Sequence, residues 1–361
     1  MRSAFRVASL SLSLCVPSLA LAGPGTVLLS AAKGVVETRG PREKVYATAA
    51  PGAQLEHGAR VRTGADAEAT LSYADGTSAV LKPSSEILVR VSKEPSGSPN
   101  GVVMFFGRIW SKVAKSQSED TSFEVRTANA VAGVRGTAFE TGVGLDGAVK
   151  VVVREGKVAV SGDDEARAAE LKPGYTVVAS DAGALGAVEE ADEIDWNGWL
   201  GEHAKKMERR GLEVAKSLDG RLNKRRAKLE KLIGEQRALR KKLEGLEARK
   251  KRGEPVGKEI RKTFEKLAKL TGRIEDMAAR LEGAFGLFEE WGRVAGGGGI
   301  ADADKIAGMA GNIAKIAADF ADMIEEGTDL SEEGMHELID DMGKGKKTGP
   351  GDSAADELFG E

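Results

Sequence analysis

The sequence predicts a multi-domain protein in which an all-β N-terminal domain precedes an antiparallel helical hairpin, or coiled coil, and a further short helical segment. Two observations support this prediction. Before about residue 190, valine, threonine and glycine are frequent, and apolar residues alternate along short segments, as they do in half-buried strands. After that point, apolar residues recur at alternating spacings of three and four, the period of a packed helix.

The first 22 residues have the organisation of a cleavable secretory signal. Arg2 and Arg6 supply a positive start, an apolar stretch of about 15 residues follows, and Ala20-Leu21-Ala22 fits a cleavage site. The stretch is shorter than the roughly 20 residues of a membrane-spanning helix. We therefore expect residues 1–22 to be removed and the protein to be periplasmic or secreted. No later apolar run approaches this length, so no integral membrane span is expected in the mature chain.

Residues 23–190 are expected to form the all-β domain, either as a β-solenoid or as a sandwich, because short apolar segments are punctuated by Gly, Pro or Asp. The clearest hairpin signal is Asp75-Gly76, which lies between the alternating segments 70–73 and 78–81. A similar unit joins residues 148–153 to 157–160 through Arg154-Glu155-Gly156. The other expected strands are 27–29, 34–38, 87–91, 102–106, 123–126, 139–143 and 176–179.

Residues 195–294 are expected to form the helical hairpin. Leucines of the first segment lie on one seam from Leu222 to Leu246, provided that Arg225 and Gln236 fill two of its positions. The second segment repeats the pattern from residue 260 to 288. Between them, glycine at 253 suits a helix end and proline at 255 suits a first helical turn, which predicts a reversal near 253–257.

The C-terminal part is expected to be less regular. Residues 295–342 contain the glycine linker 296–299 and an acidic helical segment with a weaker apolar period. Residues 343–361 lack any period and are rich in glycine, lysine and acidic residues, so they are expected to be disordered.

Several ordered motifs in the β half resemble the FecR domain, which is the periplasmic part of an iron-citrate signalling regulator. The longest runs from Phe123 through Val125-Arg126-Thr127-Ala128 to Gly133-Val134-Arg135-Gly136-Thr137 and Phe139, and shorter pieces lie at 58–64, 69–77 and 151–160. The resemblance covers about residues 25–180. The motif residues that we single out as structural or binding positions are Gly133, Val134, Arg135, Gly136, Thr137, Phe139, Asp75, Gly76, Glu155 and Gly156.

The resemblance implies a module without catalytic residues. Regulators of this family place a sigma-factor-binding region and a membrane span before the domain and a small receptor-contacting domain after it. Here a cleavable signal precedes the domain and a helical hairpin follows, so we expect only the periplasmic binding module to be retained. From the residues themselves, Gly133 and Gly136 are expected to need unusual backbone angles, and Arg135 is a candidate buried or half-buried cation.

No catalytic, cofactor-binding or metal site is expected. The three histidines, His57, His203 and His336, do not lie at metal-ligand spacing, and neither a phosphate-binding loop nor a nucleophile elbow occurs. The single cysteine, Cys15, lies within the expected signal, so the mature chain has no thiol chemistry. These observations predict that the protein is not an enzyme.

Charge is unevenly distributed along the helical half. Residues 201–252 carry 19 Lys and Arg against 8 Asp and Glu, whereas residues 296–361 carry 5 against 16. The acidic segment is expected to pack on the basic helix, or the helix contacts an anionic envelope polymer or lipid head group. An exported protein meets little nucleic acid, so that partner is not expected. The basic helix face is represented by Lys224, Arg225, Arg226, Arg240, Lys241 and Lys242.

These observations predict a non-catalytic exported envelope protein. The β domain would bind an envelope protein or a glycan, and the hairpin would serve as an interaction arm that can also mediate self-association. The alternative is a periplasmic signalling component, related to FecR-type sigma-factor regulation, that acts through a separate membrane partner.

Overall fold

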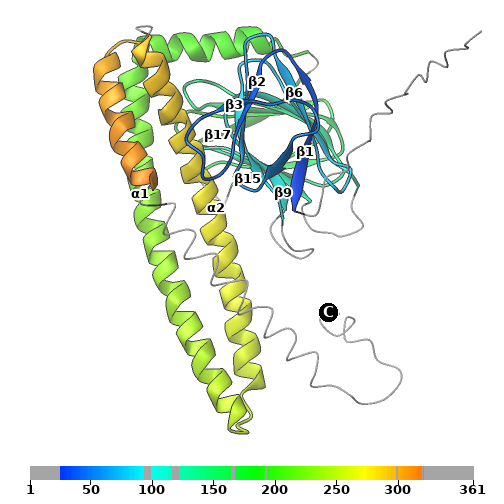
Figure 1. Cartoon of the computed structure of the whole chain (residues 1–361), viewed down its shortest axis with the longest axis vertical. Helices are drawn as coiled ribbons and strands as arrows, with labels where there is room; N and C mark the ends of the chain where they lie inside the picture. Colours follow the sequence, from blue (N-terminus) through cyan, green and yellow to red (C-terminus); the bar gives the residue numbers. More distant parts are fainter. Residues whose placement is uncertain are drawn as a thin grey trace, which may run out of the picture.

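The structure is a computed structural model that describes residues 25–92, 99–115, 122–163, 167–191, 193–297, 300–318 and 320. It has the predicted fold class. An all-β domain is followed by two long helices that pack as a hairpin, and a short third helix occupies residues 303–318 (Figure 1). The expected signal peptide at 1–22, His336, the tail at 343–361 and most of the acidic segment lie outside the described residues.

The β strands form two sheets, here called sheet A and sheet B. Sheet A has the order β4-β1-β6-β7-β9-β12-β13-β16-β17. Sheet B has the order β3-β2-β5-β8-β9-β10-β11-β14-β15. Pairing is antiparallel except between β9 and β10. The strands are β1 Thr26–Lys33, β2 Val36–Arg39, β3 Ala47–Thr48, β4 Gln54–Glu56, β5 Arg60–Thr63, β6 Glu68–Ser72, β7 Ser78–Leu81, β8 Glu86–Arg90, β9 Asn100–Lys112, β10 Phe123–Arg126, β11 Val131–Val134, β12 Ala138–Val143, β13 Val149–Glu155, β14 Val158–Ser161, β15 Ala168–Leu171, β16 Tyr175–Ala179 and β17 Leu185–Glu190.

Strand β9 belongs to both sheets. Its residues up to Phe106 pair with β8 and β10 in sheet B, and its residues from Gly107 onward pair with β7 and β12 in sheet A. The crossing point is Gly107, which has a φ of 94° and lies so close to Ser85 that a β-carbon would collide with it. Only glycine satisfies both conditions, so this residue fixes where the strand changes sheet.

The two sheets enclose a single apolar core. Alternate residues of sheet A, such as Leu71 and Phe139, and of sheet B, such as Phe123 and Val125, are fully buried in the same cluster. This alternation is the period-2 pattern of strands that have one face in a core. Of the two expected architectures, the β domain is therefore the sandwich.

Of the two sequence units that were predicted to be hairpins, one folds as a hairpin and the other does not. Strands β6 and β7 pair as predicted, with Ser72 opposite Ser78, and Gly76 has a φ of 86° in the turn. The unit around Glu155-Gly156 was expected to be similar, and this expectation is wrong. Strand β13 pairs with β12 and β16 in sheet A, whereas β14 pairs with β11 and β15 in sheet B. The alternating pattern shows which face of a strand is buried but not which strand lies beside it, so the two cases look alike in sequence.

Helix α1 spans Trp196–Lys251 and helix α2 spans Gly257–Gly296. Asp195 caps α1, since its carboxylate accepts a hydrogen bond from the backbone N–H of Gly198 at 2.9 Å. Arg210 has non-helical angles (φ −131°, ψ 22°), so α1 bends there. The seam contains Arg225 and Gln236 as buried residues, and the Gln236 amide donates to the Thr271 hydroxyl at 3.1 Å. A polar pair therefore fills one of the gaps in the leucine pattern.

The helices pack on part of each outer face of the sandwich. The first segment of α1 places Trp196 against Val152 on the outer face of sheet A. The second half of α2 places Ala279 against Leu88, Val103 and Phe105 on the outer face of sheet B. The third helix and the residues that flank it pack on the other two, where Ile300 and Ile306 lie against Gly211 and the ring of Phe320 meets that of Phe285 edge to face. No helix in the described part of the chain is both long and apolar enough to cross a membrane.

The remainder of the hairpin, residues 233–270, extends away from the sandwich and is called the arm below (Figure 1). It has a small apolar core of its own, formed by Leu243, Leu246, Val256, Ile260 and Leu267. Nineteen residues of α1 lie in the arm, so it projects by about 28 Å at 1.5 Å per residue.

Candidate functional site

The motif residues of the β domain gather in turns at one end of the sandwich. The Thr137 hydroxyl lies within hydrogen-bond distance of the carbonyl oxygens of Arg135 (3.1 Å) and Lys157 (3.0 Å), and so links the turn after β11 to the turn after β13. Gly136 has a φ of 61°, and a β-carbon on Gly156 would lie 2.8 Å from the Thr137 oxygen. Both glycines are therefore required by the geometry of this end.

The Asp75-Gly76 turn joins the same end. Its carboxylate accepts a hydrogen bond from the backbone N–H of Thr77 at 2.8 Å, and the Thr77 hydroxyl accepts one from Ala114 N at 3.2 Å. The neighbouring Val113 N donates to the carbonyl oxygen of Thr137 at 2.8 Å. Motif pieces that are far apart in sequence thus meet through turn and backbone hydrogen bonds. Val134 and Phe139 lie in the core beneath them.

Two expectations about this motif need correction. Arg135 is exposed, not buried or half-buried, because Val134 takes the inward position and the next side chain points outward. Gly133 has ordinary strand geometry, since it lies within β11 and pairs with Glu124 and Ala159, and only Gly136 has a positive φ. The motif end thus provides turn geometry and no cluster of reactive side chains.

The second part of the motif, residues 126–130, lies under the helices. Gly283 of α2 sits directly on this turn, where a β-carbon would come within 2.5 Å of Ala128 N. One turn further along, Gly286 lies flat against the ring of Phe105. These glycines let the helix axis approach the sheet closely.

Charged residues connect the sandwich to the helices at this junction. Asp163, which follows β14, pairs with Arg225 and also with Arg221 at 3.5 Å and Arg280 at 3.7 Å. Arg225 and Arg280 are buried. Burial lowers the pKa of Arg225, and the neighbouring Asp163 carboxylate opposes that change. One carboxylate of the β domain is therefore shared by three guanidinium groups of the helices.

Arg126 extends this network from the motif itself. It pairs with Glu124 at 2.6 Å on its own strand and with Asp276 of α2 at 2.7 Å. Asp276 pairs in turn with Arg280 at 3.0 Å, one helical turn away. Positive and negative side chains thus alternate along a network that runs from β10 through α2 to the loop after β14.

A second polar junction lies near the start of α1. Asp146, whose side chain is fully buried, accepts hydrogen bonds from His203 at 2.8 Å and pairs with Lys206 at 3.0 Å. Burial would raise the pKa of Asp146, but hydrogen bonding to His203 and Lys206 lowers it below its usual value. Lys206 also pairs with Asp181 at 3.0 Å. His203 therefore acts as a docking residue rather than as an isolated surface histidine.

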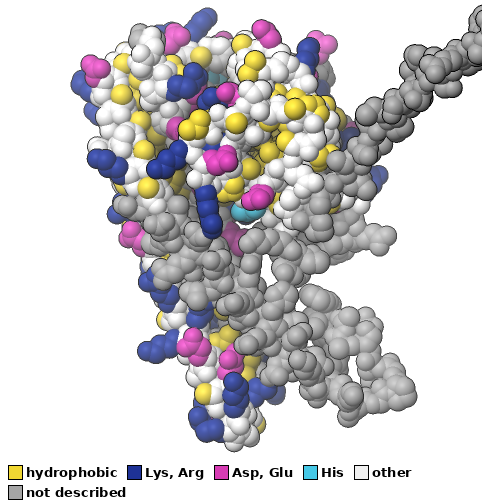
Figure 2. Space-filling model, viewed as in Figure 1, with side chains coloured by type: hydrophobic (Ala, Val, Ile, Leu, Met, Phe, Trp, Pro, Cys, Tyr) yellow, Lys and Arg dark blue, Asp and Glu magenta, His cyan; other side chains and the backbone are white. Residues whose placement is uncertain are grey.

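The predicted basic helix face is not one surface. Arg225 is buried in the interface, and Arg226 pairs with Glu230 on α1 itself at 3.1 Å. The prediction missed this because Arg225 occupies a seam position, which faces inward whatever its charge. Lys224, Lys241 and Lys242 are exposed and Arg240 is half-buried. Figure 2 shows Lys and Arg side chains spread along the projecting part of the hairpin.

The described part of the acidic segment packs through apolar residues. Ile300, Ile306, Ile313 and Phe320 join the core cluster of the two long helices. Within residues 300–318, the ion pair is local and joins Lys305 to Asp302 at 2.7 Å. The predicted contact with the basic helix thus occurs for this part, but near the bend of α1 and through an apolar surface. The more acidic residues after 320 lie outside the described chain.

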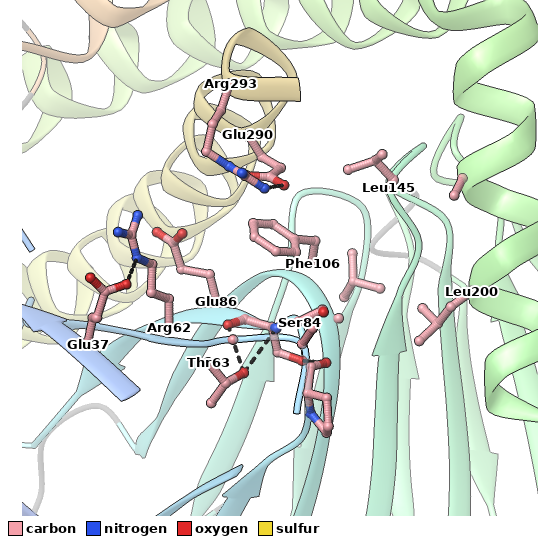
Figure 3. Close-up of a pocket in the computed structure, with 17 residues that line it drawn as sticks. Glu37, Arg62, Thr63, Ser84, Glu86, Phe106, Leu145, Leu200, Glu290 and Arg293 are labelled. Atoms are coloured by element: carbon pink, nitrogen blue, oxygen red, sulfur yellow. Dashed lines mark hydrogen bonds and ion pairs between the residues drawn. The ribbon is translucent and has the colours of Figure 1, made fainter. Parts of the chain in front are cut away.

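A cleft of about 560 Å³ lies between sheet B, the loop after β12 and both long helices (Figure 3). Its rim carries Arg62, which donates to Glu37 at 2.7 Å, and Arg293, which pairs with Glu290 at 2.5 Å. Burial raises the pKa of Glu86, which accepts a hydrogen bond from Tyr46 at 2.5 Å. The remaining wall includes Phe106, Leu145 and Leu200.

The polar groups that line the cleft contact one another. The charged groups on its rim are already paired with one another. The hydroxyl of Thr63 donates to the backbone oxygen of Lys82 at 2.6 Å and accepts from the backbone N–H of Ser85 at 3.1 Å. Among the described residues, no group of three His, Cys, Asp or Glu side chains could hold a metal ion.

The residues that carry the junction were missed by the sequence analysis. Asp163 and Asp146 lie in loops, where single acidic residues give no distinctive signal. Arg280 and Asp276 had a usable signal, because they stand four apart in the second helix, which is the spacing of an ion pair within a helix.

Comparison with known proteins assigns the β domain. The model of the family described as FecR protein matches residues 59–159, which extend from the start of β5 into β14. The chain therefore contains a FecR domain, as its motifs predicted. A protein from Parabacteroides distasonis, provisionally described as an anti-sigma factor, matches in two crystal structures at 1.65 and 2.50 Å resolution.

Both matches to that protein are distant. Each has 22% sequence identity and a TM-score of 0.32, and each covers 39% of this chain. The matched parts cover 64% and 63% of the other chain, so this chain spans less than two thirds of it. No functionally curated protein is significantly similar to the chain.

Proposed function

We propose that this protein is a non-catalytic binding protein of the cell envelope, in which the FecR domain is a rigid base and the arm binds a partner. The observation that carries the proposal is the arm. It continues the helical seam through Leu243, Leu246 and Ile260 beyond the point where the described strands support it. Apart from Ile233 and Leu270 at its base, the arm adds nothing to the core that the helices share with the β domain, and such a projecting hairpin is expected to make outward contacts.

The arrangement of the base supports this assignment. Part of each outer face of the sandwich is covered by the chain's own helices, through Trp196 on sheet A and Ala279 on sheet B. The arm carries 13 Lys and Arg against 6 Asp and Glu, which favours an acidic partner surface. Export rests on the signal-like sequence at 1–22, and the non-catalytic role rests on the FecR domain and the paired groups of the cleft.

The proposal is tested by shortening the arm. The variant lacks residues 237–250 and 257–270, so the native turn, residues 251–256, directly links Gln236 to Thr271. These two residues are already hydrogen-bonded to each other across the seam. The deletion removes two heptads from each helix and withdraws the tip by about 21 Å.

Photo-crosslinkers at Lys241 in the arm and at Lys157 at the motif end are compared in intact cells. The expected result is a defined partner at Lys241 that no longer co-purifies with the shortened variant. Lys157 is the control, because it lies at the motif end of the sandwich and outside the arm, and its side chain is 65% exposed. If the shortened variant retains the same partner, the arm is not the binding element.

The match to the FecR family at residues 59–159 supports a second candidate function. In this alternative the protein is a FecR-type signalling component that acts through a separate membrane partner. Deletion of the gene is then expected to change transcription of a defined set of genes, and the full-length chain is expected to restore it. An unchanged transcript profile after deletion rejects the alternative without affecting the binding role.

A further inference from the structure

A second hollow, of about 360 Å³, lies where the base of the hairpin meets sheet B. Four cationic side chains line it: Lys228 from α1, and Lys269, Arg273 and Arg280 from α2. Two carboxylates, Glu124 and Asp276, also line it. The hollow thus has more positive than negative groups on its walls.

The two carboxylates of the hollow, Glu124 and Asp276, do not neutralise its exposed cations, because both are already paired with arginines. Glu124 accepts from Arg126 at 2.6 Å, and Asp276 accepts from Arg126 at 2.7 Å and from Arg280 at 3.0 Å. Lys269 and Arg273 are exposed, and within the described chain neither makes an ion pair with a carboxylate. An anion entering the hollow would therefore meet two cations, Lys269 and Arg273, that pair with no carboxylate of the described residues.

The rear wall adds donors that are fixed in place. Arg280 is only 4% exposed at its side chain and Arg225, behind it, is 9% exposed. In the described residues, the Nη1 atom of each makes no hydrogen bond. Both share the single carboxylate of Asp163 with Arg221. Of the two, Arg280 lines the hollow, and its Nη1 lies 3.7 Å from Asp163, beyond hydrogen-bond distance. A buried donor without an acceptor is costly, and a bound anion would supply one to Arg280.

We propose that this hollow is a binding site for a phosphate group, either free or as a monoester of a small molecule. Arginine presents planar pairs of N–H donors that match phosphate oxygens, and the excess of cations suits a dianion better than a single carboxylate. The Ser161 hydroxyl lies on the wall contributed by β14 and offers a further donor. The site lies at the base of the arm and does not depend on the partner proposed for its tip.

The test uses isothermal titration of inorganic phosphate into the full chain at about 0.15 M salt, where diffuse attraction between exposed charges is screened. The site variant is Lys269→Glu/Arg273→Glu. The matched control is Lys258→Glu/Lys262→Glu, which makes the same change in net charge at the same spacing on the same helix but outside the hollow. All four residues are exposed, so neither variant disturbs the core.

The wild type and the control are expected to bind phosphate with affinities within about threefold of each other, while the site variant loses at least about tenfold. Glycerol 3-phosphate is titrated in parallel, and whichever of the two ligands binds more tightly identifies the free ion or the monoester. Two results would overturn the proposal: no binding by the wild type at about 10 mM phosphate, or equal weakening in both variants. The shortened-arm variant lacks Lys269, so it is not used in this titration, and neither result decides whether the arm binds a partner.

Discussion

Replacing Asp163 by asparagine removes the one carboxylate that three arginines of the helices share. The structure sets the size of the effect. Arg280 and Arg225 are 4% and 9% exposed at their side chains, so their charges stay buried when the carboxylate is lost. Breaking a buried pair costs about 3–5 kcal/mol, and because Asp163 itself is 27% exposed we expect about 3 kcal/mol.

The assay is equilibrium unfolding in urea followed by circular dichroism, with the free energy of unfolding as the readout. Glu170→Gln is the matched control. Its ion pair with Lys157, at 2.9 Å, is more than half exposed on both sides, so no measurable change is expected. The two substitutions remove the same charge from the same domain and differ in burial.

A second substitution separates buried charge from a general loss of packing. In Asp163→Asn/Arg225→Met, one of the uncompensated cations is removed as well. We expect the double variant to unfold at a higher urea concentration than Asp163→Asn alone. The reasoning is refuted if Asp163→Asn changes the free energy of unfolding by less than about 0.5 kcal/mol, or if the double variant shows no recovery.

Two further predictions concern helix docking. Gly283→Ala places a β-carbon 2.5 Å from the backbone nitrogen of Ala128, so α2 must move and the free energy of unfolding should fall by about 2 kcal/mol. Gly272→Ala, on the same helix in open space, should raise it by up to about 1 kcal/mol. Equal shifts in the melting temperatures of the two variants would contradict this. Asp146→Asn should cost about 2 kcal/mol at pH 7. Because the pKa of Asp146 is lowered on folding by its contact with His203, its stabilising contribution exists above about pH 4 and is lost as the pH falls through the folded value. Urea unfolding at pH 7 and pH 3 should therefore show the difference between wild type and variant shrinking, and a constant difference would rule out this role.

Much of the fold follows from local patterns in the sequence. Asp75-Gly76 predicted its hairpin because a turn residue with positive φ is needed only a few residues from both strands. The leucine seam predicted the helical hairpin even where Arg225 and Gln236 interrupt it, because period and not polarity decides which side faces the partner helix.

The features that the sequence did not predict depend on contacts between distant parts of the chain. Gly156 turns the chain from one sheet to the other, yet its local pattern is that of a hairpin. The outer faces of the sandwich carry apolar residues such as Phe105 and Val152 because helices cover them, and this is visible only once the helices are placed. Arg135 was misjudged because it follows Val134 in an apolar stretch, and such a stretch indicates burial of alternate strand residues and not of all of them.

Strand β9 has a consequence for how the domain is assembled. In both sheets, β1–β8 lie on one side of it and β10–β17 on the other, so among the described strands no backbone ladder joins the two sides except through β9. A chain emerging from its N-terminus can therefore complete one lobe before the second lobe exists. The second lobe, β10–β17, would then pair with a strand β9 that already bends at Gly107. A fragment that ends after β9 should therefore fold by itself.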